Sequence, residues 1–66
     1  MGIGERVRNS RINKGLTQVL FAKASGVSKS TILLCERGKR IPGPRILKKM
    51  ADTLGVTVLY LRKGVE

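Results

Sequence analysis

Lysine and arginine are abundant in this chain, and the chemistry that such cationic side chains support is the binding of anions. Among 66 residues there are 14 Lys and Arg against 4 Asp and Glu, a formal net charge of +10. A charge of this size on so short a chain indicates a polyanionic partner, most simply nucleic acid. Ribosomal, membrane-surface and antimicrobial proteins share such a composition, so charge alone leaves these classes open.

The residue types that serve catalysis and metal binding are scarce. The chain has no histidine and a single cysteine, Cys35, so the commonest general acid–base group, zinc knuckles and Cys–His dyads are excluded. Neither GxGxxG nor GxxxxGK[ST] occurs, which excludes the familiar phosphate-binding loops. We therefore predict no enzyme activity, no metal and no cofactor, and interpret Cys35 as an inert core residue.

Length and hydropathy predict one domain over residues 1–66. A hydrophobic fraction of 41% is enough for a small core, and no apolar run approaches the ~18 residues of a membrane span. The opening stretch MGIGERVRNSR lacks the apolar region of a secretory signal, and one cysteine cannot form an internal disulfide. These features predict a cytoplasmic protein without membrane association.

Hydrophobic spacing and terminal residues predict an all-α fold of five short helices. No segment shows sustained period-two alternation. The expected helices cover residues 5–14, 18–25, 29–37, 44–54 and 58–62. Their expected N-caps are Thr17, Ser28 and Thr57, and their expected C-terminal glycines are Gly15, Gly26, Gly38, Gly55 and Gly64. The fourth helix has the clearest apolar stripe: Ile46, Leu47, Met50, Ala51 and Leu54.

The second and third predicted helices lie close together in the chain. About three residues around Gly26 join them, which is the spacing of a helix-turn-helix over about residues 17–37. Ala22 and Gly26 are small, which predicts that the two helices cross closely. Val27 and Ile32 are expected to fill the space between the helices. At the other end of the chain, Tyr60 and Leu61 are expected to close the core.

Many of these residues recur at the offsets of a known family. They are Leu16, Thr17, Gln18, Ala22, Gly26, Val27, Ser28, Thr31, Ile32, Glu36, Arg37, Gly38, Pro42, Leu47, Ala51, Leu54, Gly55 and Val56. In this arrangement the chain resembles the Cro/repressor-type (XRE family) helix-turn-helix domain of phage repressors and bacterial regulators, from about residue 6 to residue 64. The resemblance implies a lambda-repressor-like fold that reads the major groove of double-stranded DNA with the helix at about 29–37.

A helical projection divides that helix into two sides. The side expected to face inward comprises Ser28, Thr31, Ile32 and Cys35, and the side expected to face outward comprises Lys29, Ser30, Leu33 and Leu34. The resemblance implies that the outward side enters the groove, where guanine offers O6 and N7 and thymine offers a methyl group. On this interpretation Lys29 reads guanine, Ser30 a base or a phosphate, and Leu34 a thymine methyl, with Leu33 near the groove wall. Two exposed leucines would also suit a protein partner or another subunit.

The resemblance also implies contacts outside the reading helix. The expected phosphate contacts are Thr17, Gln18, Arg37, Lys39 and Arg40. Arg11 and Glu36 are expected to form a partly buried ion pair. The expected dimer surface is Ile41, Arg45, Val58 and Leu59, by which a homodimer would bind a palindromic operator.

The functional prediction is a bacterial or phage-encoded transcriptional regulator, a repressor that binds the nucleoid in the cytoplasm. The alternatives are an antitoxin, a restriction–modification controller, or a protein-interaction module that uses the exposed leucines. A cationic membrane-active peptide is disfavoured, because such peptides seldom need four helix breaks with defined caps.

Overall fold

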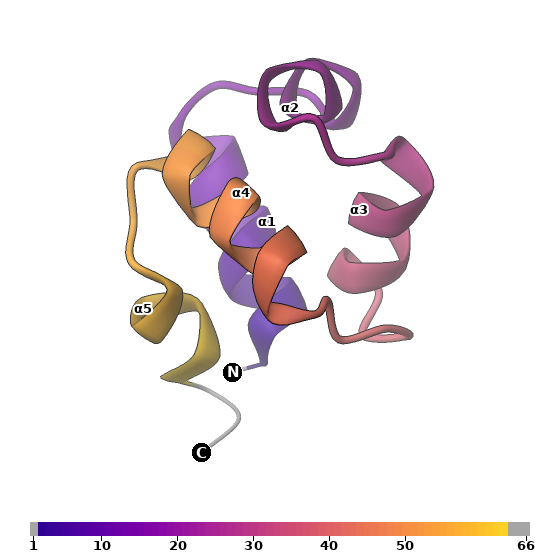
Figure 1. The fold of residues 1–66 in the computed structure, drawn as a ribbon. Helices are drawn as coiled ribbons and strands as arrows, with labels where there is room; N and C mark the ends of the chain where they lie inside the picture. Colours follow the sequence, from indigo (N-terminus) through magenta and orange to yellow (C-terminus); the bar gives the residue numbers. More distant parts are fainter. Residues whose placement is uncertain (1, 64–66) are drawn as a thin grey trace.

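The computed structural model describes residues 2–63, which form five helices and no strand. They are α1 (Ile3–Asn13), α2 (Gln18–Ser25), α3 (Lys29–Glu36), α4 (Pro44–Leu54) and α5 (Val58–Arg62). In Figure 1, α4 crosses in front of α1 at the centre, α2 lies above them, α3 lies to the right and α5 to the lower left. The predicted all-α, five-helix fold is confirmed. The glycine expected to end the last helix, Gly64, lies outside the described residues.

Side-chain caps begin three of the five helices. Thr17 Oγ1 accepts a hydrogen bond from the Leu20 amide at 3.1 Å, and Thr57 Oγ1 accepts one from the Tyr60 amide at 3.0 Å. The Ser28 hydroxyl oxygen accepts from the Thr31 amide at 3.2 Å. Each bond satisfies one of the amides that a helix start leaves without an intrahelical partner. The three predicted N-caps are confirmed.

The core is built from one side of every helix. Its buried residues are Ile3, Val7, Phe21, Val27, Ile32, Cys35, Leu47, Met50, Ala51, Leu54 and Leu61. Four residues of the predicted α4 stripe are buried and the fifth, Ile46, packs partly buried against them. Helix α3 packs against α1 and α2, and the side of α3 that faces away from them is free of other elements (Figure 1).

Helix α1 begins two residues earlier than predicted. Its first turn lies against the end of α3, where Ile3 is buried and Gly4 contacts α3 backbone. A Cβ on Gly4 would overlap the carbonyl oxygen of Cys35 and would lie 3.0 Å from its carbonyl carbon. This packing stabilises a turn that lacks a side-chain cap, since Gly2 occupies the N-cap position.

Two other expectations were wrong. Gly26 does not permit a close helix crossing, because a Cβ there would meet nothing within 4 Å; its φ of 74° shows that the turn instead needs the left-handed conformation that glycine adopts readily. Tyr60 does not close the core, and 41% of it is exposed. Successive helical residues are separated by 100°, and Leu61 is fully buried, so the neighbouring Tyr60 side chain turns outward. Its ring stacks under the Arg6 guanidinium, whose Cζ lies 4.9 Å from the ring centroid.

Candidate nucleic-acid interface

Helix α3 presents two chemically different sides. Ile32 and Cys35 are fully buried and anchor it to the core. Lys29 and Ser30 are exposed, Leu34 is 36% exposed, and Leu33 is half-buried at the edge of the outward side. An outward side with a cation, a hydroxyl and an aliphatic group can contact guanine, mixed donors and acceptors, and thymine methyls respectively.

The expectation that Ser28 faces inward was wrong. Ser28 is exposed, because it precedes the first helical residue and its backbone is extended, with φ −64° and ψ 147°. Its hydroxyl donates a hydrogen bond to Thr31 Oγ1 at 2.8 Å, and Thr31 is half-buried. Ser28 therefore acts as a cap and not as a core residue.

A network of hydrogen bonds around Glu36 fixes α3 relative to α1 and α2. Arg11 Nε and Nη2 donate to the two Glu36 carboxylate oxygens at 2.7 and 3.0 Å, and Gln18 Nε2 donates to Oε1 at 3.2 Å. Arg11 Nη1 donates to the Leu16 carbonyl at 2.9 Å, in the turn before α2. The Glu36 side chain is only 3% exposed. The pair Arg11–Glu36 thus joins α1 to α3, and Gln18 adds α2 to the same network.

The first turn of α2 retains donors on the exposed surface. Thr17 satisfies the Leu20 amide, whereas Gln18 and Val19 supply the first two backbone N–H groups of the helix, which have no intrahelical acceptor. Gln18 also keeps one amide hydrogen beyond the one it donates to Glu36. Free donors of this kind at a helix start can bind an anion, and the phosphate contacts of Thr17 and Gln18 remain a prediction.

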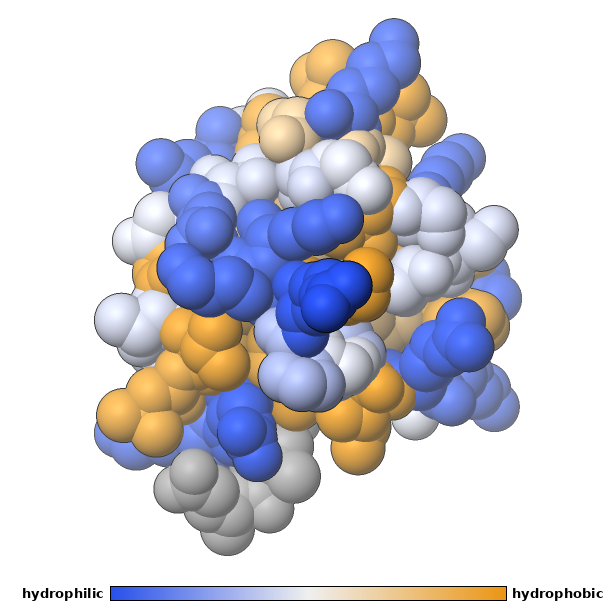
Figure 2. Space-filling view, in the orientation of Figure 1, coloured by the Kyte–Doolittle hydropathy of each residue, from blue (hydrophilic) through white to orange (hydrophobic). Residues whose placement is uncertain are grey.

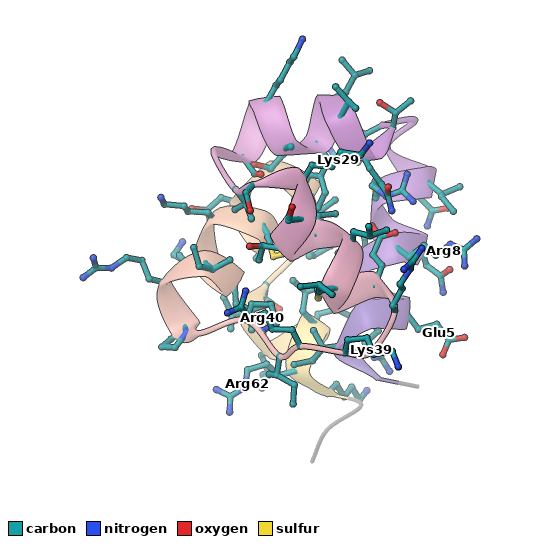
Figure 3. The ribbon with its side chains drawn as sticks, turned by 90° about the vertical axis from the view of Figure 1, so that its right-hand side faces the viewer. Glu5, Arg8, Lys29, Lys39, Arg40 and Arg62 are labelled. Carbon is teal, nitrogen blue, oxygen red and sulfur yellow. The ribbon has the colours of Figure 1, made fainter. Side chains whose placement is uncertain are left out.

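Cations surround the outward side of α3. Figure 3 shows Lys29 at the start of α3, Lys39 and Arg40 in the segment that follows it, and Arg8 of α1 beside it. Arg37, the C-cap of α3, is exposed as well. The structure thus brings the predicted base contacts together with Arg37, Lys39 and Arg40.

The residues of the predicted dimer surface come from the segment before α4, from α4 and from α5, and Ile41 also lines a hollow at the end of α3. Ile41 and Val58 line one hollow of about 270 Å³ together with Ile3, Pro42, Pro44, Leu47 and Arg62. Leu59 is 68% exposed and Arg45 is also exposed, but neither lines this hollow. Figure 2 shows apolar side chains gathered over α5 at the lower left. The dimer surface remains a prediction.

Burial raises the pKa of the Cys35 thiol to about 11, and the neighbouring Glu36 carboxylate adds to the effect. The thiol is therefore protonated at neutral pH and chemically unreactive. Among residues 2–63 no three His, Cys, Asp or Glu side chains gather where they could hold a metal ion. Nor is any helix in this part of the chain long and apolar enough to cross a membrane.

One cation of this surface was not singled out by the sequence. Arg8 lines two hollows beside α3, although no role was predicted for it from the sequence. The sequence did contain a signal for the position of Arg8. It precedes Arg11 by three residues, and residues three apart share a helix face. Arg11 was already predicted to reach α3.

Two helices joined by a tight turn at a glycine of positive φ, the second with a free side ringed by cations, define a helix-turn-helix domain. The helix-turn-helix family profile matches residues 7–61, and the chain belongs to this family. The predicted resemblance to Cro/repressor-type domains is confirmed.

Relatives of the chain carry regulator names. The uncharacterized HTH-type transcriptional regulator YazB of Bacillus subtilis is 44% identical over 54 residues, which are 82% of this chain and 78% of YazB. The SPbeta prophage-derived regulator YonR of the same organism is 34% identical over 63 residues, which are 96% of this chain and 58% of YonR.

Solved structures show the same fold. The P22 c2 repressor in complex with synthetic operator 9T superimposes with a TM-score of 0.90 at 31% identity, covering 97% of both chains. The structure of the biofilm regulator SinR in complex with DNA superimposes with a TM-score of 0.86 at 33% identity, covering 89% of this chain and 95% of SinR. The restriction–modification controller C.AhdI of Aeromonas hydrophila gives 0.84 at 34% identity, covering 89% of each.

Proposed function

We propose that this chain is a sequence-specific transcriptional regulator that binds double-stranded DNA by placing α3 in the major groove. The observation that supports it best is the division of α3, where buried Ile32 and Cys35 leave Lys29, Ser30 and Leu34 facing out. The similarity to P22 c2 repressor and SinR, both solved in complex with DNA, supports the same conclusion. It acts as a repressor, by occupying an operator and excluding polymerase, and not as an enzyme.

The outward residues read bases by different means. Lys29 donates to guanine O6 and N7, and Ser30 bonds a base edge or a phosphate. Leu34 packs against a thymine methyl group. Leu33 contacts the groove wall with the part of its side chain that is not buried.

Phosphate contacts on both flanks hold the helix in register. Thr17 and Gln18 contact one strand from the start of α2, while Arg37, Lys39 and Arg40 contact the phosphates at the other end of α3. Because these contacts release counterions, log K falls with log salt by about 0.9 for each phosphate neutralised.

The regulator works as a homodimer on a palindromic operator. Two copies pair through Ile41, Arg45, Val58 and Leu59, and their α3 helices then enter successive major grooves about 34 Å apart. Its site of action is the nucleoid in the cytoplasm.

Selection from random duplex DNA tests this function. Wild-type protein should enrich a palindrome, and Lys29→Ala or Leu34→Ala should enrich a different sequence, whereas Arg40→Ala should weaken binding to every duplex alike. Replacing the contacted thymine by uracil removes only the methyl group, so it should weaken the wild type several-fold and leave Leu34→Ala unaffected. Identical selected sequences for wild type and both α3 variants would refute this assignment of the reading surface.

A restriction–modification controller is the second candidate, supported by the similarity to C.AhdI. The selected operator separates the two candidates, because a controller's operator should precede the genes of a methyltransferase or an endonuclease. The antitoxin alternative predicts an operator before a toxin gene. A protein-interaction module that uses Leu33 and Leu34 predicts no preferred duplex at all.

A further inference from the structure

We infer that the hollow between α1 and α3 is a seat for a DNA backbone phosphate, and that Arg8 is the residue of α1 that binds it. The inference rests on the proposed DNA-binding function. The predicted phosphate contacts come from the start of α2 and from the end of α3 with the segment that follows it. This inference adds a contact from α1.

The hollow has the size and lining of an anion site. Its volume is about 200 Å³, and it is lined by Arg8, Arg11, Gln18, Leu33, Glu36 and Arg37. A water molecule takes about 30 Å³ of liquid, so the space admits a phosphate group with several waters. Arg8 and Arg37, both exposed, come from α1 and from the end of α3.

The electrostatics of this hollow favour an anion. Three arginines line it against one acidic residue, Glu36. That carboxylate is already bonded to Arg11 at 2.7 Å and to Gln18 at 3.2 Å, and it is only 3% exposed. Within residues 2–63, the side chains of Arg8 and Arg37 have neither an ion pair nor a hydrogen bond, so their guanidinium donors are available to a ligand.

The position of the hollow identifies the anion as a phosphate of bound DNA. Its lining includes Gln18 at the start of α2 and Leu33 at the edge of the reading side of α3. A second hollow, of about 500 Å³, continues from Arg8 and Arg37 to Arg40. Figure 3 shows Arg8 on the same side of the molecule as Lys29, Lys39 and Arg40. A sugar-phosphate strand beside α3 would therefore pass over Arg8, whose planar guanidinium can bind phosphate with two parallel hydrogen bonds.

The test compares Arg8→Gln with Lys49→Gln on the selected operator. Lys49 is an exposed residue of α4 that lines neither hollow, so its variant removes the same charge without removing the seat. Arg8→Gln should bind about tenfold more weakly at low salt, which corresponds to one charge-assisted hydrogen-bonded contact. Its salt slope should fall by about 0.9, while its selected sequence and melting temperature stay those of the wild type.

A scan of the operator with neutral methylphosphonate linkages locates the phosphate. In wild type and Lys49→Gln, one linkage in each half-site should weaken binding, and that penalty should vanish in Arg8→Gln because the partner has already been removed. Equal behaviour of Arg8→Gln and Lys49→Gln, or persistence of every penalty in Arg8→Gln, would overturn the seat while leaving the proposed function intact. Failure of the wild type to bind any duplex would instead overturn the proposed function, and the seat with it.

Discussion

Glu36 is the residue on which the geometry of the interface depends most. Its buried carboxylate accepts hydrogen bonds from Arg11 on α1 and Gln18 on α2, while its backbone ends α3. Arg11 in turn bonds the carbonyl of Leu16 in the turn that precedes α2. A single carboxylate therefore links the helix that reads bases to the helix start that is predicted to hold a phosphate.

Replacing Glu36 by alanine should lower the free energy of unfolding by about 3 kcal/mol, because it leaves the Arg11 guanidinium largely buried without its counter-charge. Thermal or urea denaturation measures the loss. The matched control is Asp52→Ala, which breaks the equally short but exposed pair with Lys48 at 2.7 Å and should cost less than about 1 kcal/mol. Similar losses in the two variants would show that burial does not distinguish these pairs.

Among the elements, α1 and α3 depend on each other in a way that neither sequence segment reveals. The first turn of α1 has no side-chain cap, and it is held by the contact of Gly4 with the backbone at the end of α3. Only a residue without a Cβ fits there. The close approach also brings Arg8 and Arg37 to the same hollows.

Gly4→Ala tests this contact against intrinsic helix propensity. In an isolated helix, alanine is favoured over glycine by about 1 kcal/mol. At Gly4 the added methyl group would overlap Cys35 backbone, so we expect a loss of about 1–3 kcal/mol in urea denaturation. Gly2→Ala is the control, since a Cβ at Gly2 would meet nothing within 4 Å. A Gly4→Ala protein as stable as the wild type would contradict the close packing.

At the scale of the whole molecule, the exposed apolar residues of α5 and the outward side of α3 belong to elements that do not pack against each other. Cations ring α3 (Figure 3), whereas Leu59 is exposed on α5, and Ile41 lines both the hollow that Val58 lines and the one that Arg8 and Arg37 line. Separate surfaces allow one copy to contact DNA and a second copy simultaneously. This arrangement is what a two-fold dimer on a palindrome requires.

Leu59→Lys should therefore weaken binding to the palindrome at least tenfold and leave binding to a single half-site nearly unchanged. Each buried leucine contributes about 1.5–3 kcal/mol, and the two-fold interface would lose two. Titrations of both duplexes, with sedimentation of the complexes, measure the effect. Ile12→Lys, which adds the same charge at an exposed apolar residue of α1, is the control. Equal losses on both duplexes would place Leu59 outside the dimer contact.

Much of the fold follows from local chemistry along the chain. Thr17, Ser28 and Thr57 begin helices through hydrogen bonds that span three residues, and Gly55 ends α4 with a φ of 71°. Such signals lie within a few residues of the boundary that they set, so they can be recognised without the tertiary structure. The burial of Ile32 and Cys35 follows in the same way from helical periodicity.

The sequence by itself determined the five-helix fold, the family and the outward side of α3, because each depends on residue types at short, fixed separations. Only the tertiary structure decided that α1 starts at Ile3, that the Tyr60 ring stacks with Arg6, and that Arg8 and Arg37 line the same hollows. These features depend on how closely separate helices approach one another. That distance is fixed by packing between segments far apart in the sequence, so it cannot be predicted from any local stretch of the chain.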